Sequence, residues 1–166
     1  NHCMIRITNE ALDKLSTDAA ASPRKRKNLN LHERPDDVVQ RLFNAIEPGT
    51  YVRPHRHSDP STWEVIYVVR GSAVLLIFDA AGAVLERLEL SCRGPLNGIE
   101  MRPDTWHAMA SLEPGTVFFE VKQGPYVPAQ GDQSASWAPA EGTPAAARFE
   151  SWYRSARPGD RPPALS

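Results

Sequence analysis

The sequence has few cysteines, no long apolar run and almost no net charge. Its two cysteines, Cys3 and Cys92, lack CxxC spacing. That usage suits a reducing compartment and disfavours a secreted scaffold held by disulfides. No apolar run approaches the roughly 20 residues that a membrane-spanning helix needs, and the first residues lack the apolar core of a signal peptide. We therefore expect a cytoplasmic protein without membrane insertion.

The near-zero charge also bears on the partners. The chain carries 19 Lys and Arg against 20 Asp and Glu, a formal charge of -1. This balance offers no general attraction for nucleic acid, so any recognition of an anion must be local. A chain of 166 residues with 41% hydrophobic residues has the size and balance of one globular domain.

The middle of the chain consists of short segments rich in Val, Ile, Leu and aromatic residues, separated by turns that contain Pro or Gly. With no helices between them, about eight such strands predict an antiparallel sandwich or barrel. An additional strand is expected at Asn28–Leu31, where Asn28, Asn30 and His32 alternate with leucines. The other expected strands are Val38–Ile46, Tyr51–His57, Trp63–Arg70, Ala73–Phe78, Val84–Leu90, Gly98–Met101, Trp106–Leu112 and Thr116–Val121.

Helices are expected only towards the two ends. Thr8 is a suitable N-cap for an amphipathic helix that reaches about Ala21. Residues 144–154 predict a second short helix, which begins at a proline and is anchored by Phe149, Trp152 and Tyr153. The remaining residues, 157–166, are rich in proline and are expected to be disordered.

We therefore predict one domain in three parts. Residues 1–35 form an N-terminal helix and a polar strand, and residues 36–126 form the β-barrel core. Residues 127–166 form a wrapping arm, the short helix and a flexible tail.

Three histidines and a glutamate stand out as candidate metal ligands. His55 and His57 are separated by one residue, so strand geometry would place both imidazoles on one face. Glu64 lies in an otherwise apolar strand, where a carboxylate needs a partner such as a metal ion. His107 opens another apolar strand. Neutral imidazoles and a carboxylate suit one divalent ion of Fe, Mn, Ni, Co or Zn and would leave open coordination positions.

The glycines that frame these residues complete a recognisable pattern. Gly49, His55, His57, Glu64 and Gly71 occur in an order and spacing that resembles the first cupin motif. The resemblance implies an all-β cupin fold, a double-stranded β-helix or jelly-roll barrel, with His55, His57, Glu64 and His107 as the ligands of the metal.

This sequence departs from the cupin pattern in two places. The gap between His57 and Glu64 is wider than the family's usual one, so the rim of the pocket should differ. In the second motif, which Gly98 and His107 match, Asp104 replaces a glycine. Aspartate tolerates turn conformations nearly as glycine does, so we expect the turn to be kept. Arg102 and Ser111 replace the proline and the asparagine of the same motif.

A closer resemblance covers roughly residues 10–140. The chain is similar to the WbuC family of cupin-fold metalloproteins. This likeness implies a metal and a sugar-related substrate in bacterial O-antigen or lipopolysaccharide metabolism. The blocks that carry it are Ser22-Pro23-Arg24, 28–32, 40–44, Pro54-His55-Arg56-His57, Thr105-Trp106-His107, 113–116 and 119–126.

Residues around the predicted metal are candidates for binding a substrate. If His55 and His57 point inward, strand alternation also turns Arg53 and Tyr51 inward. The guanidinium group of Arg53 could then bind a carboxylate or phosphate through two oxygen atoms. Asn28, Asn30 and His32 are expected to close over the mouth and bind a hydroxylated ligand. Lys122 and Tyr126 are predicted to be surface and packing residues.

Two classes of function remain open at this level. The first is a metal-dependent enzyme, an oxygenase or an isomerase, that acts on a small polar molecule. No catalytic base stands out beyond the ligands, so the catalytic residues stay unknown. The alternative is a non-catalytic module that binds or senses a small ligand, because a shared fold does not fix chemistry. Exposed barrel edges favour a homodimer in either case.

Overall fold

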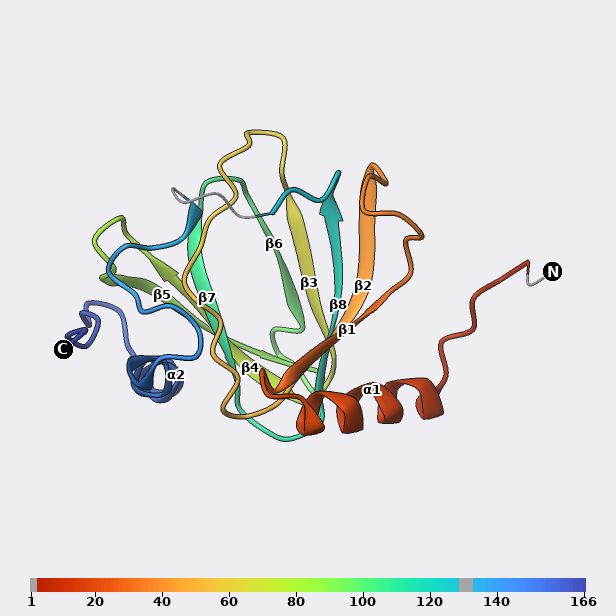
Figure 1. Ribbon diagram of the computed structural model, residues 1–166, viewed down its shortest axis with the longest axis horizontal. Coiled ribbons are helices and arrows are strands. Elements are labelled where there is room, and N and C mark those ends of the chain that lie inside the picture. The colour runs from red at the N-terminus through yellow and green to blue at the C-terminus, as the bar shows by residue number, and fades with distance from the viewer. Residues whose placement is uncertain (1–2, 129–132) are drawn as a thin grey trace.

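The computed structural model describes residues 3–128 and 133–166, which contain eight strands and two helices (Figure 1). The helices are α1 (Asn9–Ala21) and α2 (Pro144–Ser155). The strands are β1 (Arg26–Asn30), β2 (Val39–Ile46), β3 (Glu64–Arg70), β4 (Ser72–Phe78), β5 (Val84–Ser91), β6 (Gly98–Met101), β7 (Trp106–Ser111) and β8 (Thr116–Gln123).

The strands form two antiparallel sheets that share one core. The larger sheet has the order β1-β2-β8-β3-β6, and the smaller has the order β5-β4-β7. Residues from both sheets, such as Ile66 and Phe118 of the larger and Leu75 and Met109 of the smaller, pack into one buried cluster. Their inward-facing apolar side chains therefore bind the sheets into a barrel.

Strand β4 is buried on both faces, which explains its unbroken apolar sequence. Ala73 and Leu75 pack between the sheets, whereas Val74, Leu76 and Phe78 pack on the other side against α2. The smaller sheet is therefore the middle layer between the barrel interior and a helix.

Helix α1 covers the outer face of the larger sheet. Thr8 caps its N-terminus, because the Thr8 side chain accepts a hydrogen bond from the amide of Ala11 at 3.1 Å. Leu12 and Leu15 then pack against Phe43 in a separate buried cluster. The predicted helix and its cap are confirmed.

Helix α2 covers the outer face of the smaller sheet, on the opposite side of the molecule from α1 (Figure 1). It begins at Pro144, as predicted, and both Phe149 and Tyr153 are completely buried. Trp152 is partly buried against the same cluster. The three aromatic residues therefore anchor α2 onto the barrel.

The prediction of a strand at Tyr51–His57 is wrong. Apart from isolated bridges at His55, residues 51–57 form no strand. Pro54 has no backbone N–H to donate, which removes one bond from any ladder. The segment is instead held through single contacts, such as the amide of Arg56 donating to the carbonyl of Gln133 at 3.0 Å.

The first residues of the tail expected to be disordered, 157–160, pair with β5 in the structure. The amide of Gly159 donates to the carbonyl of Val84, and the amide of Val84 donates to the carbonyl of Asp160. The tail therefore uses backbone groups at the exposed edge of β5, which would otherwise lack partners. Within the part of the chain that the structure describes, neither helix is long and apolar enough to cross a membrane.

Truncation of Phe149 should loosen α2. Phe149→Ala removes a fully buried ring, so we expect the free energy of unfolding to fall by about 3 kcal/mol or more in urea titrations. Ser151→Ala, at an exposed position of the same helix, is the control and should change it by less than about 0.5 kcal/mol. A loss below about 1 kcal/mol in Phe149→Ala would contradict the anchoring role.

Candidate metal centre

The centre of the site is a backbone pairing between His55 and His107. The amide of each residue donates to the carbonyl of the other, both at 3.0 Å. Paired residues of this kind project their side chains from the same face, and the two ring centroids are 4.3 Å apart. The irregular segment 51–57 is thereby fixed to strand β7.

Hydrogen bonds to the two rings determine which nitrogen is free. Nδ1 of His55 lies 2.9 Å from the carbonyl oxygen of Arg53, and Nδ1 of His107 lies 2.8 Å from that of Thr105. A carbonyl oxygen only accepts, so each Nδ1 must carry the proton. Nε2 of both rings then keeps its lone pair, as metal-binding histidines require.

Burial keeps these rings neutral. It lowers the pKa of His107 to about 3, with a further contribution from the neighbouring His55, and it lowers the pKa of His55 as well. Both rings are therefore in the state that binds metal at neutral pH.

His57 completes a compact triad. Its ring centroid lies 5.4 Å from that of His55 and 5.9 Å from that of His107. Ligand atoms of the three histidines lie within 4.8 Å of one another, so one metal ion could contact all of them. His32 is not part of this group, whose members among the described residues are His55, His57 and His107.

Glu64 brings a carboxylate to the triad from the first position of β3. Its Oε2 lies 3.5 Å from Nε2 of His57 and is completely buried without a hydrogen-bond donor. Burial by itself would raise the pKa of Glu64, but the contact with His57 and the charge of Lys122 hold it below its usual range. A buried, ionised and unsatisfied oxygen beside three imidazoles is what a cation site requires.

A second carboxyl group, not singled out by the sequence reasoning, lies beside Glu64. Glu120 of β8 is buried, and burial together with the charge of Glu64 raises its pKa well above the usual range. Asn44 of β2 lines the same cavity, and its buried Oδ1 also lacks a partner. The sequence does contain a signal for Glu120, because it is an acidic residue within the apolar segment Phe118–Val121. The same kind of signal identified Glu64.

A cavity of about 450 Å³ contains the triad. Apolar side chains of Leu42, Val52 and Met109 form part of its wall, and Lys122 lies among the basic residues of its lining. The cavity wall therefore combines apolar and cationic side chains.

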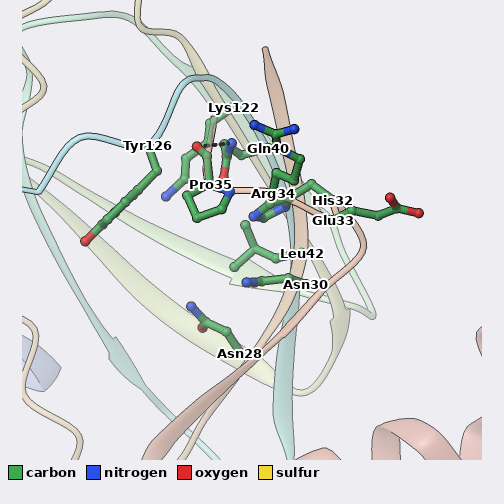
Figure 2. A pocket seen from close by; sticks show the side chains of 10 residues that line it. All are labelled: Asn28, Asn30, His32, Glu33, Arg34, Pro35, Gln40, Leu42, Lys122 and Tyr126. Atoms are coloured by element: carbon green, nitrogen blue, oxygen red, sulfur yellow. Dashed lines mark hydrogen bonds between the residues drawn. The ribbon is translucent and has the colours of Figure 1, made fainter. Parts of the chain in front are cut away.

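An adjoining cavity of about 420 Å³ shares Asn28 and Lys122 with the first. Figure 2 shows Asn28 and Asn30 projecting from β1, below Lys122 and Tyr126 in this view. His32 lines the same cavity. The expected alternation therefore places Asn28, Asn30 and His32 together.

The strand alternation that was expected to turn Tyr51 and Arg53 inward does not hold. The hydroxyl of Tyr51 donates to the carbonyl of Pro139 at 2.8 Å, and its ring packs in the cluster under α2. Arg53 lines a neighbouring cavity with His55 and His57, and its Nη2 donates to the carbonyl of Ala135 at 3.0 Å. Because residues 51–57 are not a strand, alternation does not extend from His55 back to Tyr51.

The structure places Lys122 and Tyr126, expected as surface and packing residues, around the metal cavity. Both line the metal cavity and three adjoining cavities. Lys122 is placed there by its strand, because its backbone pairs with that of Glu64. Tyr126 follows the end of β8, and its amide donates to the carbonyl of Pro35. Lys122 therefore lies on the inner face of the barrel beside Glu64, whereas Tyr126 is exposed at the mouth.

Asp104 adopts the turn conformation expected of a glycine. Its φ is 61°, in the left-handed region, and its amide donates to the carbonyl of His57 at 2.7 Å. Its carboxylate lies 3.0 Å from the guanidinium of Arg56. The substituted turn therefore contacts the segment that carries His55 and His57.

Comparison with known proteins places the chain in a family. Residues 7–90, just over half of the chain, match the family described as Domain of unknown function (DUF6016). The chain belongs to this family. No curated protein matches the sequence.

Solved structures resemble this DUF6016 member at low sequence identity. TT1209 from Thermus thermophilus is 17% identical, with 72% of this chain and 97% of that chain covered and a TM-score of 0.50. CapF from Staphylococcus aureus, a capsular polysaccharide assembling protein, is 21% identical, with 64% and 29% covered and a TM-score of 0.50. A cupin 2 domain-containing protein from Halorhodospira halophila is 22% identical, with 58% and 62% covered and a TM-score of 0.45.

The predicted fold class is confirmed. The DUF6016 chain is an all-β barrel of two antiparallel sheets, with a helix before the barrel. The three histidines in its cavity are arranged so that they could hold a metal ion.

Replacing Asp104 should separate the backbone requirement of the turn from the ion pair with Arg56. Asp104→Gly and Asp104→Ala both remove the carboxylate, but only alanine is strained at a φ of 61°. We expect the alanine variant to be less stable than the glycine variant by about 1 kcal/mol in urea titrations. Equal stabilities would show that the positive φ has no energetic importance.

Proposed function

We propose that the chain binds one divalent metal ion through His55, His57, Glu64 and His107 and acts on a small polar, sugar-related molecule. One observation carries this proposal: a buried carboxylate oxygen without a donor beside three imidazoles whose ligand atoms cluster within 4.8 Å. The ion would be Fe, Mn, Ni, Co or Zn, each of which accepts imidazole and carboxylate ligands.

The chemical role of the ion follows from its open positions. A bound divalent ion would polarise oxygen atoms of the ligand or activate dioxygen. The protein's own contribution is to keep the imidazoles of His55 and His107 neutral through burial and to orient them through the carbonyls of Arg53 and Thr105. The buried surroundings of His107 and Glu64 limit the access of water to the ligands.

The wall beside the metal cavity supports a hydroxylated ligand. Asn28 and Asn30 project into the adjoining cavity (Figure 2), and neither amide group has a hydrogen-bond partner within residues 3–128 and 133–166. Each amide offers both a donor and an acceptor, which suits the hydroxyl groups of a sugar. Tyr126 is 58% exposed and adds an aromatic face at the mouth.

The narrower biological setting is part of the same proposal. A place in O-antigen or lipopolysaccharide metabolism follows from the resemblance to the WbuC family, and a cytoplasmic location follows from the cysteine usage. The name of CapF concerns capsular polysaccharide, but at 21% identity the likeness to CapF extends to the fold alone.

A homodimer completes the proposal. Strand β1 is an edge of the larger sheet, and Ile5 and Ile7 of the N-terminal segment are exposed. Such features favour association with a second copy, which light scattering during size-exclusion chromatography would measure.

Metal loading tests the ligand set. Chelator-treated protein offered Fe(II), Mn(II), Ni(II), Co(II) and Zn(II) separately should bind one equivalent of at least one ion. Saturation at 100 times Kd should stabilise the fold by about 2.7 kcal/mol in thermal unfolding. His107→Ala and Glu64→Gln should lose this stabilisation, whereas His32→Ala should keep it. Full loading of His107→Ala would rule out the proposed centre.

The polar wall is tested by ligand binding. Replacing both Asn28 and Asn30 by alanine should weaken binding of D-glucose, D-mannose or D-glucuronate by roughly two- to tenfold for each hydrogen bond lost. Metal content should stay unchanged, and Asn9→Ala on α1 serves as the control. If the double variant bound every sugar as tightly as the parent, the amides would have no part in recognition.

A further inference from the structure

Lys122 occupies a central position in the binding region. Its backbone pairs with Gln40 of β2 on one side and with Glu64 of β3 on the other. Directly opposed residues of antiparallel strands share a face, so the Lys122 side chain lies on the inner face with the candidate metal ligand. It lines the metal cavity and the cavity of Figure 2.

The ammonium group of Lys122 forms no ion pair with an acidic side chain of the described residues. Within the described residues its ammonium group has neither a hydrogen bond nor an acidic side chain at ion-pair distance, although the side chain is half-buried. Other basic residues at the mouth are already engaged. Arg24 and Arg26 both bind Glu141, and Arg56 binds Asp104.

The mouth beside the histidines has a local excess of positive charge. Its lining contains five basic residues and a single acidic residue, Glu141, in a chain whose formal charge is only -1. The basic residues of this lining are Arg24, Arg26, Arg53, Arg56 and Lys122. A concentration of one sign in a recess attracts ions of the opposite sign and strengthens their hydrogen bonds.

The simpler explanation for the position of Lys122 is that its charge balances those of Glu64 and Glu120. That role weakens once a divalent cation is present, because the ion neutralises Glu64 directly and repels the ammonium group. In the metal-loaded protein the half-buried charge of Lys122 would then no longer be balanced by Glu64. A partner from the ligand would satisfy it.

We propose that the ligand of the metal cavity is an anion, a carboxylate or a phosphate borne on a small hydroxylated molecule, and that Lys122 binds the anionic group. The inference rests on the metal centre and the polar wall of the proposed function. It specifies the class of ligand as acidic and makes Lys122 the residue that distinguishes acidic from neutral ligands.

Calorimetric titration of the metal-loaded full chain tests this inference. The probes are D-glucuronate, its neutral isostere D-glucuronamide, and D-glucose 6-phosphate. The parent should bind at least one of the two anions roughly tenfold more tightly than the amide, the effect of one charge-assisted hydrogen bond. Preference for glucuronate identifies a carboxylate, and preference for the sugar phosphate identifies a phosphate.

Three variants show whether Lys122 is responsible. Lys122→Gln should abolish the preference for the anion while keeping one equivalent of metal, and Lys122→Arg should restore part of it. Lys14→Gln, which removes an exposed charge on α1, should behave as the parent.

Different results overturn different claims. A parent protein that takes up no metal contradicts the proposed function itself. A metal-loaded parent that binds neither anion more tightly than the amide overturns the anionic ligand. An undiminished preference in Lys122→Gln, or loss of metal from that variant, overturns the role of Lys122.

Discussion

The pairing of His55 with His107 is the constraint on which the site depends. Two backbone hydrogen bonds join a segment without regular structure to β7 and set their rings side by side. Helix α2 also holds residues 51–57 in place, because the hydroxyl of Tyr153 donates to the carbonyl of Val52 at 3.1 Å. The C-terminal helix is thus part of the scaffold of the metal centre, although it contributes no ligand.

Electrostatics divides the cavity into an inner and an outer part. Deep in the barrel, Glu64 and Asn44 present buried oxygen atoms without donors beside neutral histidines. At the mouth, arginines and Lys122 predominate. A chain with almost no net charge therefore separates its charges locally, with a site suited to a cation inside and a surface suited to an anion outside. A ligand that carries an acidic group and reaches the ion would satisfy both.

The sequence predicts those parts of the fold whose signals are local. The cap at Thr8, the start of α2 at Pro144 and the turn at Asp104 each depend on the intrinsic preferences of one residue. Residues 51–57 form no regular strand, and their backbone partners are His107 of β7 and residues 133–135 of the distant arm, which no local pattern reveals. Lys122 was misjudged for a related reason: the strand pairing that places it beside Glu64 is a tertiary feature.

The most direct test of the metal centre is a crystal structure of the metal-loaded protein with anomalous diffraction recorded at the absorption edge of the bound ion. We expect one strong peak in contact with Nε2 of His55 and of His107, with His57 and Oε2 of Glu64 also in contact. A peak that lies away from these four side chains in the fully loaded protein would contradict the proposed metal centre.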